Sequence, residues 1–335
     1  MRALQITGPG RCSLVKIDPP QCRPDEVLIH MKACTICNQH DAAVFGGRGH
    51  GGLRDYPLEP GFPGHEGAGV VAQVGQGVTD LAPGDRVVTT GIGGPPLYAE
   101  YVTRKTGTAV KFPESIDFVH AAPLELFGCV HRAFTLTRNV RGVRVGVAGL
   151  GPAGQAAVAL ARAFGAAEVV GFDIIAQRRE KALKMGATRV VDPTPFLPAH
   201  EAVKRRLGGH GDLDEKQKAT LEAVRSSQCE ILFECSGSPA SLQTSFLLAG
   251  NDLTVFGYTD QPVEVLPAVW FQKELLIRSS KILTMDDLRA VVALLAEEKI
   301  DTRPIVTDVM RFSQYAAALE RLGRREAIKV ALTWE

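Results

Sequence analysis

The sequence predicts a two-domain α/β protein, in which a β-rich domain is followed by a parallel sheet with helices on both faces. Its 335 residues exceed the roughly 100–200 residues of an ordinary single domain. Over residues 1–127, short strand-like runs alternate with turns dense in glycine and proline, as in compact β domains. From about residue 143, strand, glycine turn and helix follow one another repeatedly, which is typical of a parallel sheet.

The individual elements are consistent with this division, with residues 128–280 as the second domain and residues 281–335 as a tail that can rejoin the first. Periodicity predicts an amphipathic helix over 286–298, followed by a further helix and a strand. Residues 193–228 are rich in charge and poor in apolar side chains, so we interpret them as a solvated insertion. The clearest predicted strands are 26–31, 69–74 and 86–90 in the first domain, and 143–148, 168–172, 230–234 and 253–256 in the second.

Charge and composition narrow the class of partner. The 38 Lys and Arg residues balance the 37 Asp and Glu residues, so no strong field attracts nucleic acid or an acidic membrane, and a small-molecule partner is favoured. The apolar runs end well short of a ~20-residue membrane span, and the N-terminus lacks the apolar stretch of a signal peptide. We therefore expect a cytoplasmic protein. Seven cysteines, an odd number, favour reduced thiols or metal ligands over a disulfide framework.

A glycine-rich turn follows the predicted strand 143–148 directly and precedes a helix-like segment at 155–164. Its first glycine permits a tight turn, its second lets backbone approach a pyrophosphate, and its third lets helix and strand pack closely. This context indicates a Rossmann dinucleotide site rather than glycines that serve packing alone. The turn reads Gly149-Leu150-Gly151-Pro152-Ala153-Gly154.

The next predicted strand, 168–172, ends in Asp173, close to the expected spacing for the acid that binds a ribose 2′-hydroxyl. A 2′-phosphate beside this carboxylate would be repelled, which favours NAD over NADP as the cofactor. Arg178 and Arg179 follow a few residues later and keep NADP from being excluded.

The candidate metal ligands lie in the first domain. Cys37 precedes His65 and Glu66 by 28 and 29 residues, and a thiolate, an imidazole and a carboxylate together suit a catalytic zinc ion. Spacing alone leaves the alternative of a buried thiol, a hydrogen-bonded core histidine and a surface acid.

The order of these motifs resembles the zinc-dependent medium-chain dehydrogenase/reductase family of alcohol, polyol and threonine dehydrogenases. The resemblance runs almost from end to end and is weakest at 193–228. It implies a GroES-like β domain, completed by the C-terminal tail, and a Rossmann domain. The most specific block is Gly64-His65-Glu66-Gly67-Ala68-Gly69, which is followed by Gly84-Asp85-Arg86-Val87 and by the dinucleotide turn.

The resemblance also implies roles for particular residues. Cys37, His65 and Glu66 match the metal site, and Glu125 matches an acid that polyol- and sugar-type members place at or near the metal. Leu126 stands where the alcohol dehydrogenase branch has a third ligand, a cysteine. Contacts with the cofactor are implied for the loops 235–237 and 256–258, including Gly257, and for Lys329, for which a solvated surface lysine is the alternative. A homo-oligomer, dimer or tetramer, is implied as well.

Two departures from the family pattern bear on metal content and mechanism. The segment 91–97 contains none of the four cysteines that hold a structural zinc in many members, so we expect one catalytic zinc and no structural zinc. Where members have Ser or Thr followed by Asp, this chain has Gln39 and His40, and an amide cannot relay a proton as a hydroxyl does. His40 is our candidate substitute in the proton path, and a merely orienting histidine is the alternative.

The sequence thus predicts a zinc-dependent oxidoreductase that transfers a hydride between NAD(H) and an alcohol, polyol or sugar hydroxyl or carbonyl group. Two other functions stay open: a zinc-free NADPH reductase of the quinone or enoyl type, and a non-catalytic NAD-binding redox sensor. Cys37, His65, Glu66 and Asp173 together argue against the reductase, and the retained metal-site residues argue against the sensor. The particular substrate is not encoded in any motif, because a pocket-lining side chain and a core one look alike in sequence.

Overall fold

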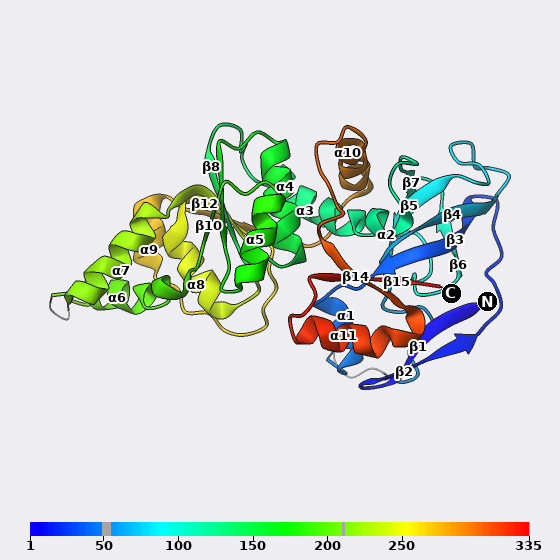
Figure 1. The fold of residues 1–335 in the computed structure, drawn as a ribbon, viewed down its shortest axis with the longest axis horizontal. Coiled ribbons are helices and arrows are strands. Elements are labelled where there is room, and N and C mark those ends of the chain that lie inside the picture. The colour runs from blue at the N-terminus through cyan, green and yellow to red at the C-terminus, as the bar shows by residue number, and fades with distance from the viewer. Residues whose placement is uncertain (49–54, 210–211, 335) are drawn as a thin grey trace. The chain divides into compact units, whose positions relative to one another are not determined.

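A computed structural model describes residues 1–48, 55–209 and 212–334, which form two compact units. The first unit comprises Met1–Gly128, Thr284–Glu298 and Thr302–Glu335, and the second comprises Cys129–Leu283 and Lys299–Asp301. The C-terminal segment of the chain therefore belongs mostly to the same unit as the N-terminal segment (Figure 1).

The first unit is built on a seven-stranded sheet in the order β14-β15-β3-β4-β5-β7, with β6 pairing β3, beside a two-stranded sheet of β1 and β2. Its strands are β1 (Arg2–Gly8), β2 (Arg11–Lys16), β3 (Glu26–Thr35), β4 (Glu66–Val74), β5 (Arg86–Thr90), β6 (Tyr101–Lys105), β7 (Ala109–Lys111), β14 (Val306–Arg311) and β15 (Lys329–Thr333). Its helices are α1 (His40–Phe45), α2 (Phe118–Ala121), the start of α3 (Leu124–Leu136), α10 (Met285–Ala296), the 3₁₀ turn η2 (Phe312–Gln314) and α11 (Tyr315–Gly323).

The register of the central strands determines which residues meet at the end of β3. Strand β3 pairs antiparallel with β4, placing Thr35 opposite Glu66, and it pairs with β15 on its other side, placing Thr35 opposite Ala331. Residues from three distant parts of the chain therefore meet at one end of β3 (Figure 1). Apolar side chains of β1, β3, β6, α11 and β15 fill the core behind them.

The second unit is a six-stranded parallel sheet in the order β10-β9-β8-β11-β12-β13. The strand order reverses between β8 and β11, which is where the carboxyl ends of a doubly wound sheet form a ligand-binding crevice. The strands are β8 (Arg144–Ala148), β9 (Glu168–Phe172), β10 (Arg189–Val191), β11 (Cys229–Glu234), β12 (Ala249–Val255) and β13 (Leu276–Ser279). The helices are the rest of α3, α4 (Pro152–Ala163), α5 (Ala176–Lys184), the 3₁₀ turn η1 (Thr194–Phe196), α6 (Ala199–Leu207), α7 (Glu215–Ser226), α8 (Pro239–Leu248) and α9 (Pro267–Lys273).

The segment 193–228 differs from the solvated insertion that its composition predicts. It forms η1, α6 and α7. A few apolar side chains of these elements, including Phe196, Ala199 and Val224, are buried in the core of the second unit. Asp214 and Gln217 form a capping box at the start of α7. The charge lies on the outer faces of helices that pack against this core.

None of the helices in the described part of the chain has both the length and the apolar character that crossing a membrane requires.

Candidate metal and cofactor sites

The end of β3 and the start of β4 bring the three predicted metal-site residues together. Cys37 follows β3, His65 directly precedes β4, and Glu66 is its first residue. One ligand atom from each of these side chains lies within 4.8 Å of the others. A thiolate, an imidazole and a carboxylate at this spacing fit the donor set of a catalytic zinc ion.

His65 is oriented and its surroundings are electronegative. Its Nδ1 lies 2.8 Å from the carbonyl oxygen of Pro63, a contact in which Nδ1–H donates and Nε2 remains for a metal. Burial lowers the pKa of His65, but a hydrogen bond with Cys37 and the negative charges of Cys37, Glu125 and Asp41 raise this pKa well above its usual value. The potential that favours an added proton here also favours a divalent cation.

Glu66 carries a buried charge that is compensated from the far end of the sequence. Its side chain is 1% exposed, and Lys329 Nζ lies 2.7 Å from Oε1 and 2.6 Å from Oε2. The hydroxyl of Thr35 donates to Oε2 as well. The alternative of a solvated surface lysine is therefore wrong for Lys329, which is 1% exposed and opens strand β15.

Glu125 stands in the first turn of α3 and is 6% exposed. Its negative charge contributes to the raised pKa of both His65 and Lys329, so it acts on the same cluster. Glu125 therefore belongs to the electrostatic surroundings of the predicted metal site. Whether it ligates the metal stays a prediction.

His40 lies beside the predicted ligands. Its ring centroid is 5.3 Å from that of His65 in an edge-on arrangement, and its Nδ1 is 3.7 Å from Asp41 Oδ1. Asp41 is a residue that the sequence analysis missed. It is fully buried, and its Oδ2 accepts hydrogen bonds from the Tyr98 hydroxyl and from the backbone N–H of Cys37, the latter at 3.3 Å.

A signal for Asp41 was present in the sequence. The family pattern has an aspartate three residues after the zinc cysteine, and here the aspartate stands one place later.

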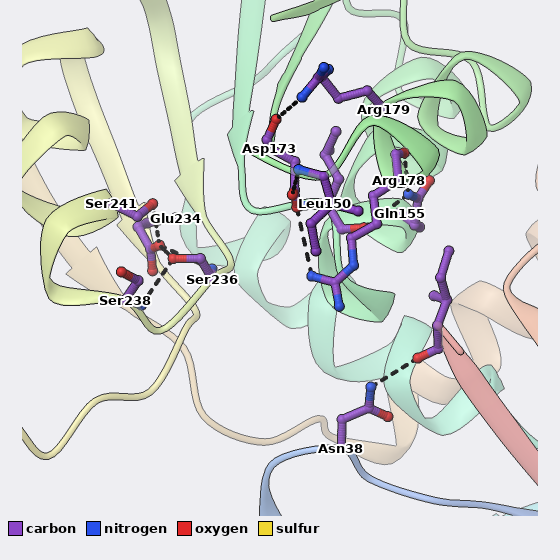
Figure 2. Close-up of polar contacts among 12 residues, drawn as sticks. Asn38, Leu150, Gln155, Asp173, Arg178, Arg179, Glu234, Ser236, Ser238 and Ser241 are labelled. Atoms are coloured by element: carbon purple, nitrogen blue, oxygen red, sulfur yellow. Dashed lines mark hydrogen bonds and ion pairs between the residues drawn. The ribbon is translucent and has the colours of Figure 1, made fainter. Parts of the chain in front are cut away.

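The loop that carries Cys37 and Asp41 also contacts the C-terminal part of the chain. Asn38 Nδ2 donates to the Ile328 carbonyl oxygen at 2.9 Å (Figure 2).

The dinucleotide turn has the geometry that its glycines predict. Gly149 adopts φ +85°, a conformation that side chains disfavour, and a Cβ on Gly154 would collide with the carbonyl oxygen of Gly149. Gly151, in contrast, faces open space: the nearest atom to its would-be Cβ is Arg178 Nη1 at 4.0 Å. Helix α4 begins at Pro152. The unpaired N–H groups of its first turn can therefore bind a phosphate.

Asp173 lies at the carboxyl end of β9 and is 6% exposed. Its Oδ2 accepts from Leu150 N at 2.7 Å, and its Oδ1 accepts from Ile175 N at 2.8 Å. Arg178 Nη1 stands 3.8 Å from Oδ2 (Figure 2). The predicted ribose-binding acid is thus fixed against the glycine turn, with the predicted arginine beside it.

Gly257, the remaining predicted cofactor residue, follows β12 and packs against the end of β11. Its N–H donates to the Glu234 carbonyl oxygen at 2.8 Å. All the predicted cofactor residues of the second unit therefore lie at the carboxyl edge of its sheet, on both sides of the strand-order reversal.

Two family models match this chain. Residues 23–114 match the alcohol dehydrogenase GroES-like domain, and residues 152–297 match the zinc-binding dehydrogenase domain. The GroES-like and Rossmann folds that the motifs imply are both confirmed by these matches and by the sheets described above.

Characterised relatives align along nearly the whole chain. D-xylulose reductase of Saccharomyces cerevisiae is 25% identical over 95% of this chain and 93% of its own length. Sorbitol dehydrogenase of Gallus gallus is 27% identical over 93% of this chain and 90% of its own length.

Solved structures share the fold. Alcohol dehydrogenase from Thermus sp. ATN1 superimposes with a TM-score of 0.79 at 23% identity, covering 100% of both chains. A zinc-binding dehydrogenase from Sinorhizobium meliloti bound to NADP superimposes with a TM-score of 0.80 at 23% identity, covering 99% of this chain and 98% of that one. Matched in both of its domains and aligned from end to end with sorbitol and xylulose enzymes, the chain belongs to the zinc-dependent medium-chain dehydrogenase/reductase family.

Proposed function

We propose that this protein is a zinc- and NAD-dependent dehydrogenase that interconverts a hydroxyl and a carbonyl group on an alcohol, polyol or sugar. The observation that carries the proposal is the meeting of Cys37, His65 and Glu66 within 4.8 Å, beside the negative charges of Glu125 and Asp41. The sorbitol- and xylulose-converting relatives support a polyol-type substrate.

When bound, a zinc ion polarises the substrate oxygen, and the nicotinamide of NAD exchanges a hydride with the neighbouring carbon. Cys37 and His65 hold the metal in this proposal, with His65 fixed by its bond to Pro63. The charge of Glu66 is shared with Lys329, so Glu66 would offer the metal a partly neutralised carboxylate. Glu125 adds a further negative charge nearby.

The substrate proton leaves through His40 in this proposal, in place of the usual hydroxyl. Asp41 Oδ1, which is buried and has no hydrogen-bond partner in the described structure, faces His40 Nδ1 at 3.7 Å. A carboxylate on that side favours the proton on Nδ1 and leaves Nε2 to accept one.

The metal proposal is tested by elemental analysis of the purified chain and of a Cys37→Ser variant. We expect about one zinc per chain, since only one ligand cluster is proposed to hold it, and loss of most of that zinc in the variant. Cys22→Ser, which changes a half-buried thiol outside the ligand clusters of the described residues, is the control and should retain the metal. Protein supplied with zinc that holds none would favour the zinc-free reductase or the NAD-binding sensor.

The cofactor proposal is tested with Asp173→Asn. Removing this charge abolishes the repulsion of a 2′-phosphate, so kcat/KM with NADP should rise relative to that with NAD by about tenfold or more. Asp192→Asn removes a neighbouring, more exposed carboxylate that pairs with Arg179, and it should leave the ratio unchanged. A wild-type enzyme that already prefers NADP would contradict the proposal.

The proton path is tested with His40→Ala. We expect kcat to fall by about 10²-fold or more near neutral pH, because general acid–base catalysis contributes on that order, together with a changed pH profile. His30→Ala is the control. It alters a histidine of β3 that stacks on Tyr101, and it should leave kcat and the pH profile unchanged. Unchanged turnover and pH profile in His40→Ala would remove this residue from the mechanism.

A further inference from the structure

The last residue of β11, Glu234, holds a buried carboxylate that the proposed reaction does not use. It is 0% exposed, and Oε1 accepts hydrogen bonds from Ser236 N at 3.0 Å, from the Ser236 hydroxyl, and from Ser241 Oγ at 3.0 Å (Figure 2). Oε2 accepts from Gly237 N at 3.4 Å. All of these donors are uncharged.

This hydrogen-bond pattern favours the ionised carboxylate. Two backbone N–H groups and two hydroxyls are directed at the two oxygens, whereas a protonated carboxyl would have to donate to an acceptor of its own. Burial raises the pKa of Glu234 above its usual value, and the bonds to Ser236, Ser241 and Gly237 oppose that rise. A negative charge is thus held inside the second unit by neutral dipoles.

Glu234 also joins the loops that follow three strands. Its carbonyl oxygen accepts from Phe256 N and Gly257 N after β12. A Cβ on Gly257 would lie 2.5 Å from Oε2, and a Cβ on Gly149, the first glycine of the dinucleotide turn after β8, would lie 2.5 Å from the side chain of Ser236. Glu234 therefore lies where the loops after β11 and β12 pack against each other, and its hydrogen-bond partner Ser236 packs against the glycine turn.

The sheet order assigns these loops to one half of the cofactor. In a doubly wound sheet, a dinucleotide lies across the strand-order reversal with one nucleotide on each side. Asp173, at the end of β9, would hold the adenosine ribose, and the start of α4 would face the pyrophosphate. The nicotinamide half then falls on the side of β11 and β12, where Glu234 lies.

We propose that Glu234 is a positioning residue whose buried charge strengthens binding of oxidised NAD relative to NADH. The nicotinamide ring is positively charged when oxidised and neutral when reduced, so a fixed negative charge in a region of low dielectric attracts only the oxidised form. The inference rests on the proposed use of NAD. It attributes to the charge of Glu234 a difference in binding free energy between NAD and NADH.

The test measures two dissociation constants without substrate: that of NADH by its fluorescence, and that of NAD by calorimetry. In Glu234→Gln, which keeps the shape of the side chain and removes its charge, we expect Kd for NAD to rise about tenfold while Kd for NADH changes by less than about twofold. Ser241→Ala removes one hydrogen bond and keeps the charge, so the ratio of the two constants should stay at its wild-type value.

Ser241→Lys provides an independent second variant, because it places an ammonium beside the intact carboxylate from a half-buried position on α8. It should lower the preference for NAD as Glu234→Gln does, and it covers the case in which that variant does not fold. Equal weakening of both cofactors in these variants would show a purely structural role and overturn the inference. Wild-type protein that binds neither NAD nor NADH would instead overturn the proposed function, and the inference with it.

Discussion

At the scale of single residues, the predicted metal site depends on a charge that lies far away in the sequence. Lys329 and Glu66 are separated by 263 positions, yet their side chains are 2% and 1% exposed and 2.6 Å apart. Burial lowers the pKa of Lys329, but the charges of Glu66 and its neighbours raise it above its usual value. The ammonium is therefore the counter-charge that lets a carboxylate stay buried at this position.

Replacing Lys329 with Met should destabilise the chain by about 3–5 kcal/mol, because it leaves the Glu66 carboxylate buried without a partner. Urea unfolding of chelator-treated protein measures this loss. Lys111→Met is a matched control, since its 2.8 Å pair with Asp85 lies at the surface, with Lys111 53% exposed. That change should cost no more than about 1 kcal/mol. Similar losses in the two variants would contradict a special role for the buried pair.

At the scale of elements, the sequence predicted most strands well and one long segment badly. The parallel strands β8 and β9 match the predicted ranges to within a residue, because each is a short apolar run bounded by a glycine turn or a helix. The segment 193–228 was misjudged, since α6 and α7 bury only a narrow stripe and expose charge on the rest. Low average hydrophobicity does not separate such helices from a loop.

Some elements also proved longer than their sequence pattern indicates. Strand β4 begins at Glu66 instead of residue 69, and β3 continues to Thr35 instead of residue 31. The added residues are held by pairing with each other and with β15, which no local pattern reveals. These extensions are what carry Cys37 to His65.

At the scale of the whole molecule, the edge of the second sheet is the surface on which we expect a homo-oligomer to form. Strand β13 ends the six-stranded sheet, and its Leu276 and Ile277 are 58% and 43% exposed. Nearby, Phe271 is 81% and Ile282 is 55% exposed. An exposed apolar edge strand is a template for pairing with another strand, and we propose that a second copy of this chain covers it.

Ile277→Lys should shift the chain from dimer or higher oligomer toward monomer, because a charge on this edge disfavours burial against another copy. Light scattering coupled to size-exclusion chromatography measures the mass. Leu183→Lys changes an equally exposed apolar side chain on α5 and should leave the mass unchanged. A wild-type chain that is already monomeric at micromolar concentration would disprove the proposed interface.

The sequence by itself determined the two-domain α/β class and the glycine turn with its acid at Asp173. The candidate ligands Cys37, His65 and Glu66 followed from the resemblance to a known family, whose most specific block contains His65 and Glu66. These features are readable because their chemistry lies in contiguous residues: a strand followed by glycines and a helix, or a block such as 64–69. That these residues bind zinc and NAD stays a prediction.

Only the tertiary structure decided which distant groups act on those residues. Lys329 reaches Glu66 across the sheet, Tyr98 reaches Asp41 from 57 positions away, and Glu234 accepts hydrogen bonds from the loop after β12. Such contacts follow from strand register and packing, which are set by the whole fold and leave no periodic trace in the chain. Buried charges and their partners are therefore the part of this protein that its sequence did not reveal.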